Sequence, residues 1–120
     1  MKYRIGVDIG GTTIKAGLVD EQFRIVERMA IPTLSEEGAD DGVRVANGIV
    51  KLVRDLCAKK GVPEDSLEGV GVCCPGSVDA ERGVIVYANN IDMHNVPLRE
   101  LVKEQTGYTV GIGNDADVAA

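Results

Sequence analysis

The chain has 120 residues, of which 44% are hydrophobic and 27% charged, an ordinary globular mixture that fits one compact domain. Its formal net charge is −6 and no run of Lys or Arg stands out, which argues against nucleic acid as a partner. It contains neither a stretch of 18 apolar residues nor a signal-peptide pattern, so we expect a cytoplasmic protein with no membrane partner.

The first part of the chain predicts three strands joined by short turns. Apolar residues alternate from Lys2 to Ile9, again from Ile14 to Val19, and once more from Phe23 to Ile31, where Pro32 ends the third strand. Strands that follow one another through such short turns form an antiparallel meander.

A helix is expected next, because apolar residues between Val45 and Cys57 recur at helical spacing. Asp40 or Ser35 can cap its start, and Gly61 closes its end. Leu67–Cys74 then predicts a fourth strand. Since a helix separates it from the third strand, a crossover to a parallel position is expected.

The next segment predicts a hairpin and a loop. Pro75-Gly76 makes a rigid turn, after which Val78–Ala80 and Val84–Tyr87 pair as short strands. Residues Asn89 to Asn95 are interpreted as a polar loop. The only histidine, His94, lies in this loop and is expected on the surface rather than acting as a base.

The last part predicts a helix from Pro97 to Glu104 and a short strand, Thr109–Gly113, before a further helix. A meander followed by strand–helix alternation indicates an α/β fold with a mixed sheet. The final helix stops after about one turn and leaves its packing unfinished. We therefore expect the sequence to be the first part of a longer protein.

The three cysteines, Cys57 and the adjacent Cys73 and Cys74, lack a Cys-x-x-Cys spacing. An odd count without that spacing supports neither a disulfide framework nor a zinc site. Adjacent thiols can form a vicinal disulfide or bind a soft metal. Small, buried, reduced core residues are the simpler interpretation.

The strongest functional signal is the run Asp8-Ile9-Gly10-Gly11-Thr12-Thr13, at the tight turn between two predicted strands. Two glycines allow consecutive backbone N–H groups to face one point, which makes an anion-binding concavity, and the threonines add hydroxyl donors. Asp8 can hold Mg²⁺ directly or through water. A plain glycine hairpin with a solvated Asp is the alternative, but the ordered run favours phosphate.

Two better-known nucleotide motifs fit less well. The chain has no G-x-x-x-x-G-K-[ST] sequence, so it is not a P-loop protein. The segment from Gly111 to Ala116 has the G-x-G-x-x-[GA] spacing of dinucleotide-binding proteins. The sequence ends before a second strand or an acidic partner for a ribose could follow, and the spacing alone is weak.

Asn114-Asp115 follow the last predicted strand, where side chains project from the edge of the sheet. Asp115 can accept a proton from an attacking hydroxyl that Asn114 orients. Either residue can instead cap the coming helix. Both interpretations stay open, and Pro75-Gly76 leaves bare backbone at the same edge.

Together these motifs resemble the ROK family (repressors, open reading frames, kinases), particularly its glucokinases, within the actin, heat-shock chaperone and sugar-kinase superfamily. The segment Ile5–Asp20 is similar to the opening of the family, Gly69–Asp79 to its glycine-rich strand and turn, and Gly113–Ala120 to its catalytic turn. Asn89–Ile91 and Asn95–Leu98 resemble its sugar loop. The resemblance implies a ribonuclease H-like (actin-like ATPase) domain with a mixed five-stranded sheet, antiparallel in strands 1–3.

The same resemblance implies that residues 1–120 form the N-terminal lobe of a two-lobed kinase that phosphorylates the 6-hydroxyl of a hexose, glucose first, with ATP and Mg²⁺. The implied phosphate ligands are Asp8, Gly10, Gly11, Thr12 and Thr13, with Asp8 also holding Mg²⁺. Asp115 would be the general base, and the implied sugar ligands are Gly76, Asn90, Asn114 and Asp115. The family's second phosphate loop and zinc motif lie in its later half. We therefore expect no zinc site in this chain, and we expect residues 1–120 alone to be inactive. The resemblance also implies that the full-length protein is a homo-oligomer.

The chain departs from the family pattern at two places, and two alternative functions are to be weighed against a sugar kinase. Asp117 stands where the family usually has Asn, and Cys73-Cys74 replace smaller or aliphatic residues. A sugar-responsive repressor of the same family would carry a DNA-binding module ahead of the fold, whereas the first strand here begins at Lys2. A non-kinase ATPase of the wider superfamily is disfavoured by Asn114-Asp115 together with Asn90.

Overall fold

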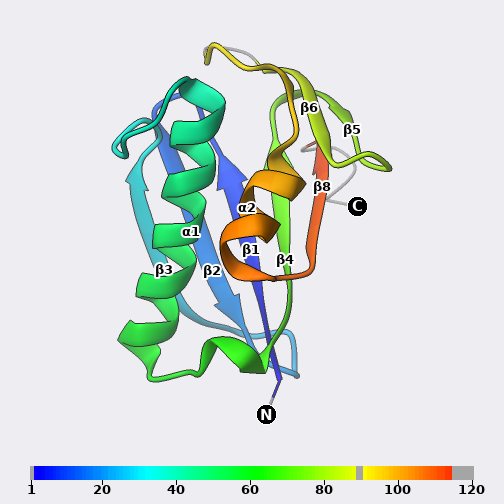
Figure 1. Cartoon of the computed structure of the whole chain (residues 1–120). Helices are drawn as coiled ribbons and strands as arrows, with labels where there is room; N and C mark the ends of the chain where they lie inside the picture. Colours follow the sequence, from blue (N-terminus) through cyan, green and yellow to red (C-terminus); the bar gives the residue numbers. More distant parts are fainter. Residues whose placement is uncertain (1, 89–90, 115–120) are drawn as a thin grey trace.

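The computed structural model describes residues 2–88 and 91–114, with Asn114 described by its backbone only. The main sheet has the strand order β3-β2-β1-β4-β8 (Figure 1). Its strands are β1 Tyr3–Ile9, β2 Thr13–Val19, β3 Ile25–Pro32, β4 Leu67–Cys74 and β8 Val110–Asn114. The first three are antiparallel, and β1, β4 and β8 run parallel, so the predicted mixed five-stranded sheet is confirmed.

A smaller antiparallel sheet has the order β5-β6-β7, with β5 Gly76–Asp79, β6 Val84–Ala88 and β7 His94–Val96. The predicted hairpin is confirmed, although its first strand starts at Gly76. The prediction of a polar loop up to Asn95 is wrong at its end, because His94 begins β7 and Met93 is fully buried. His94 itself is exposed, as expected, with its Nε2 3.5 Å from a carboxylate oxygen of Asp92.

Helix α1, Asp41–Lys60, begins after Asp40, one of the two predicted caps, and ends at the predicted Gly61. The carboxylate of Asp40 accepts a hydrogen bond of 2.9 Å from the N–H of Val43. Gly61 ends the helix in the left-handed conformation, with φ 73°. The shorter α2, Leu98–Thr106, follows Pro97, and a single 3₁₀ turn, η1, spans Glu64–Ser66.

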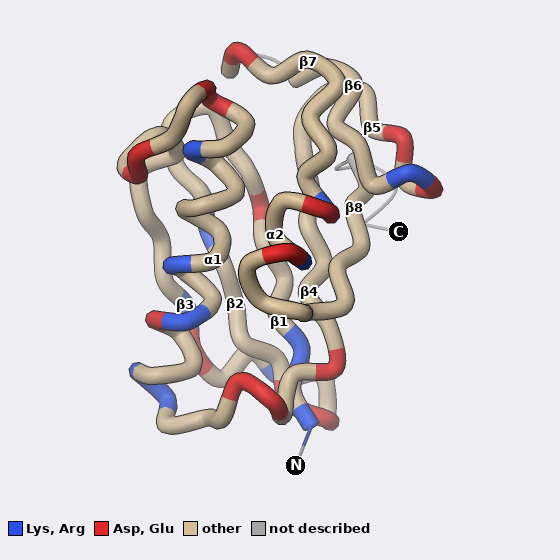
Figure 2. Tube along the Cα trace, in the orientation of Figure 1, with Lys and Arg blue, Asp and Glu red and all other residues tan. Residues whose placement is uncertain are grey.

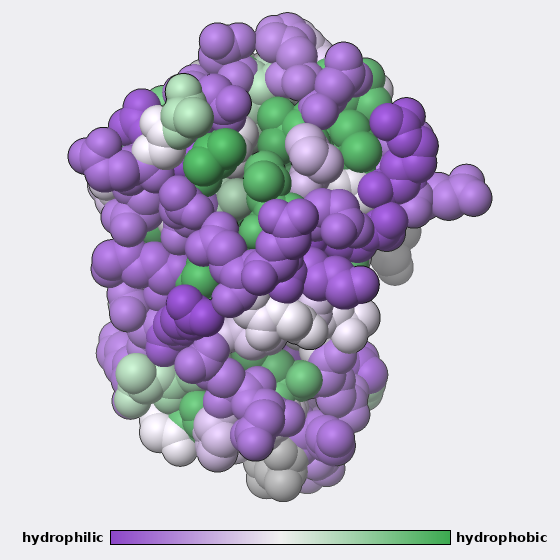
Figure 3. Space-filling model, in the orientation of Figure 1, coloured by the Kyte–Doolittle hydropathy of each residue, from purple (hydrophilic) through white to green (hydrophobic). Residues whose placement is uncertain are grey.

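Both α1 and α2 lie over the same face of the main sheet (Figure 1). The alternate residues of each strand that face them are buried, including Ile5, Val7 and Ile9 on β1. Each such aliphatic side chain contributes about 1.5–3 kcal/mol of burial free energy. Cys57 and Cys74 belong to this core, whereas Cys73 is partly exposed. The outer surface of the helical side is mostly hydrophilic (Figure 3).

The turn before β3 differs from the sequence prediction. Phe23 was expected to begin that strand, but it lies in a turn with a φ of 61° and is 77% exposed. The Asp20 carboxylate accepts the N–H groups of Gln22 and Arg24 and the Nε–H of Arg24. These bonds hold the pKa of Asp20 below its ordinary value and close the turn, so that β3 starts at Ile25.

Among the described residues, Lys and Arg are spread over several elements rather than gathered on one (Figure 2). In the part of the chain that the structure describes, no helix is long and apolar enough to cross a membrane.

Candidate functional site

The candidate site lies where the parallel strands end. Because β1, β4 and β8 run in one direction, their carboxyl ends meet at one edge of the sheet, where open α/β sheets usually bind ligands. Cys73 is the register partner of Asp8 on one side and of Gly113 on the other. The predicted phosphate turn and the backbone of Asn114 therefore share this edge.

The turn after β1 closes tightly on itself. The N–H of Gly10 donates a hydrogen bond of 2.9 Å to the carbonyl of Thr13. A Cβ atom at Gly10 would lie 2.7 Å from that same carbonyl oxygen, so only glycine fits this position. The predicted turn between two strands is thus present, and at least one of its two glycines is required by close backbone approach.

Two carbonyl groups of this turn are held by Thr33. Thr33, just after β3, donates its hydroxyl to the Gly10 carbonyl at 2.8 Å and its backbone N–H to the Thr12 carbonyl at 2.9 Å. Within residues 2–88 and 91–114, the N–H groups of Gly11 and Thr12 and the hydroxyls of Thr12 and Thr13 make no hydrogen bond. The turn therefore has the carbonyls of Gly10, Thr12 and Thr13 occupied and leaves donors available, which is an arrangement that suits an anion.

Asp8 lies beside this turn on the face of the sheet opposite to α1 and α2. It is exposed, and its register partner across the β1–β2 pair is Lys15. A shallow hollow of about 360 Å³ covers this part of the sheet, lined in part by Asp8, Lys15, Arg28 and Cys73. In the described part of the chain neither Lys15 nor Arg28 forms an ion pair. A carboxylate next to hydroxyl groups is the oxygen chemistry that Mg²⁺ prefers, so the residues present fit that ion.

Of the predicted sugar ligands, the structure describes Gly76 fully. It begins β5, shortly after β4 ends, with a φ of 130°. A Cβ atom there would overlap the Tyr87 carbonyl, so glycine is required. Asn90 and Asp115 lie outside the described residues, as does the side chain of Asn114.

Two residues of the site were missed by sequence reasoning. Lys15 faces Asp8 only because the turn between their strands fixes the register. The alternation of both strands could have indicated this once the turn length was known. Thr33 is 23 positions from Gly10, and no local pattern joins them.

The ROK family model matches residues 4–120. The chain belongs to the ROK family. It is 37% identical over 114 residues to a glucokinase of Thermotoga maritima, covering 94% of this chain and 33% of that protein. Relatives also include an N-acetyl-D-glucosamine kinase of Vibrio cholerae, at 36% identity, and a xylose repressor of Caldicellulosiruptor bescii, at 30%. The chain spans about a third of the length of the curated relatives it matches.

The fold is also that of solved members of the ROK family. A ROK family glucokinase from Streptomyces griseus, in complex with glucose and AMPPNP, superposes with a TM-score of 0.80 at 35% identity, covering 98% of this chain and 34% of that one. The predicted α/β fold of the actin-like type is therefore confirmed, as is the resemblance seen in the motifs.

Proposed function

We propose that the protein is an ATP-dependent hexose kinase and that residues 1–120 form the N-terminal lobe of two. The observation that carries the proposal is the Gly10–Thr13 turn, in which three carbonyls are hydrogen-bonded within the protein while amide and hydroxyl donors stay available beside an exposed carboxylate. Glucokinases among the relatives, and the glucose bound by one solved neighbour, favour glucose as the substrate.

The turn and Asp8 would receive the phosphate end of ATP. Gly11, Thr12 and Thr13 would donate to phosphate oxygens, and Asp8 would hold Mg²⁺. The N–H of Gly10, predicted as a further phosphate ligand, already bonds the Thr13 carbonyl, so Gly10 would shape the turn instead. Bound Mg²⁺ supplies the neutralisation of phosphate charge that such reactions need. Phosphoryl transfer depends mainly on positioning and charge stabilisation, so a rigid turn of this kind suits the reaction.

The sugar would lie near the end of β4 and β8. Asp115 would take the proton of the 6-hydroxyl as that oxygen attacks the γ-phosphate, and Asn114, Asn90 and the Gly76 backbone would hold other hydroxyls. Asn114 is the register partner of Cys74, the last residue of β4, and Gly76 follows two residues later, which supports a shared site at that edge.

The first experiment is sugar-dependent ADP release by the complete protein, over a panel of hexoses and N-acetylhexosamines. Turnover with at least one sugar is expected. Tight sugar binding without turnover over the whole panel would favour the alternative, a sugar-sensing regulator, to which the repressor relative gives weight.

Replacing Asp115 tests the catalytic role. We expect Asp115→Asn to lower kcat by roughly 10²–10⁴-fold, because a positioned general base contributes that much, with little effect on folding. Asp117→Asn is the matched control, since it removes the same charge two positions further along, and near-wild-type kcat is expected. Near-normal turnover in Asp115→Asn would reject the assigned role.

A further inference from the structure

The phosphate turn depends on one buried polar residue from another strand connection. Thr33 is only 2% exposed, although it lies outside the strands in the turn that follows β3. Both hydrogen-bond donors of Thr33 are used. Its side-chain hydroxyl donates to the Gly10 carbonyl at 2.8 Å, and its backbone N–H donates to the Thr12 carbonyl at 2.9 Å. One residue therefore fixes two of the peptide groups that make up the turn.

Holding a carbonyl fixes the direction of the next N–H group. A trans peptide is planar, so its C=O and the following N–H point in opposite directions. With the Gly10 carbonyl bonded to Thr33, the N–H of Gly11 must point away from Thr33. The peptide joining Gly10 and Gly11 has glycine on both sides and is the part of the turn with the greatest conformational freedom. It is therefore the peptide that most needs an external hydrogen bond to hold it.

We propose that Thr33 is a positioning residue for phosphate binding, whose hydroxyl keeps the Gly11 N–H directed at the phosphate by holding the Gly10 carbonyl inside. This inference rests on the proposed function and deepens it. Without the hydroxyl, rotation of the Gly10–Gly11 peptide would turn a carbonyl oxygen toward the anion and remove a donor. Losing the hydroxyl would therefore lower the affinity for the phosphates of the nucleotide and not the affinity for the sugar.

The test compares Thr33→Val with Thr33→Ser in the complete protein. Valine keeps the size, the branched Cβ and the backbone N–H of threonine but loses the hydroxyl, whereas serine keeps the hydroxyl. We expect Thr33→Val to raise the Kd for Mg·ADP, measured by calorimetry, and the KM for ATP by about threefold to tenfold, the range of one neutral hydrogen bond. Thr33→Ser should stay within about twofold of wild type, and neither variant should change kcat or the KM for sugar by more than about twofold.

Thr106→Val is the matched control, because it removes the same kind of bond, from a threonine hydroxyl to the Val102 carbonyl at 2.8 Å, within α2. It should leave Mg·ADP binding unchanged. Equal Kd values for Thr33→Val and wild type, or equal losses in the valine and serine variants, would overturn the role of Thr33 while leaving the kinase proposal intact. A wild-type protein that binds no Mg·ADP and phosphorylates no sugar would overturn both.

Discussion

At the scale of single residues, Lys15 is the cation best placed to assist the turn. It is the register partner of Asp8, lines the hollow on the same face, and has no ion pair in the described part of the chain. Directly opposite residues of antiparallel strands have Cβ atoms about 4.5–5.5 Å apart. The Lys15 ammonium could therefore reach the phosphate that, in the proposed function, Asp8 would contact through Mg²⁺.

We expect Lys15→Met to raise the KM for ATP about tenfold or more, because hydrogen bonds to charged groups contribute about 1.5–3 kcal/mol. Steady-state kinetics with varied ATP measure this, and Lys15→Arg should recover much of the loss. Lys103→Met, on the helical side of the sheet, is the control and should behave as wild type. An unchanged KM in Lys15→Met would exclude contact between this side chain and the nucleotide.

The site residues that the sequence predicted and those it missed differ in how far apart they lie along the chain. Asp8 and the Gly10–Thr13 turn are contiguous, so their residue types alone indicate phosphate chemistry. Thr33 contacts the Gly10–Thr13 turn because β2 pairs with β3, and no local sequence pattern indicates that tertiary contact. Such contacts become visible only once strand register is known.

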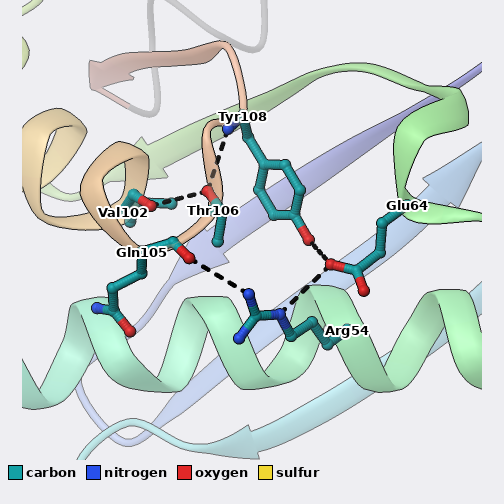
Figure 4. A network of polar contacts seen from close by, with 6 residues as sticks. All are labelled: Arg54, Glu64, Val102, Gln105, Thr106 and Tyr108. Atoms are coloured by element: carbon teal, nitrogen blue, oxygen red, sulfur yellow. Dashed lines mark hydrogen bonds and ion pairs between the residues drawn. The ribbon is translucent and has the colours of Figure 1, made fainter.

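At the scale of elements, a polar network joins the end of α2 to α1 and η1 (Figure 4). Arg54 donates to the Glu64 carboxylate and to the Gln105 carbonyl, both at 3.3 Å, and the Tyr108 hydroxyl donates to the same carboxylate. Partial burial, with the negative charge of Glu64 beside it, raises the pKa of Tyr108, so its hydroxyl stays a donor at physiological pH. The network fixes where β8 begins relative to α1.

Removing Glu64 should weaken this junction measurably. We expect Glu64→Ala to lower the free energy of unfolding by about 1 kcal/mol, since it removes the carboxylate that accepts hydrogen bonds from Arg54 and Tyr108, while Arg54 and Glu64 are both about half exposed. Tyr108→Phe, which keeps the Arg54–Glu64 pair, should cost less, and Glu104→Ala on the exposed side of α2 should stay within about 0.5 kcal/mol. Urea unfolding of the three variants gives the order, and a Glu104→Ala effect as large as that of Glu64→Ala would contradict it.

Elements with strong local signals were predictable, and elements made by tertiary contact were not. The caps at Asp40 and Gly61 and the helical period between them located α1 from sequence alone. The three-residue β7 forms because it pairs with β6 and because Met93 beside it is buried, and neither contact has a local signature. Phe23 was misassigned because its hydrophobicity suggested a strand, while Asp20 closes a turn around it.

At the scale of the whole molecule, the order of strands predicts how rigid the site is. β1, which leads into the Gly10–Thr13 turn, lies between β2 and β4, and β4 lies between β1 and β8, so the amides of these central strands are paired on both sides. β3 lies at the edge of the sheet within the described chain. Local opening costs least where backbone groups lack a second neighbour and face water.

We therefore expect amide hydrogen exchange to be slowest in β1 and β4 and at least about tenfold faster in the amides of β3 that face away from β2. Mass spectrometry or NMR of the exchanging protein measures both. Adding Mg·ADP should slow exchange in the Gly10–Thr13 turn while leaving β3 unchanged, because the backbone amides that the ligand would contact lie in the turn and not in β3. Equal exchange rates in β1 and β3 would mean that the strands leading to the site are no more rigid than the edge of the sheet. If Mg·ADP slowed exchange evenly over the whole sheet, the nucleotide would bind elsewhere.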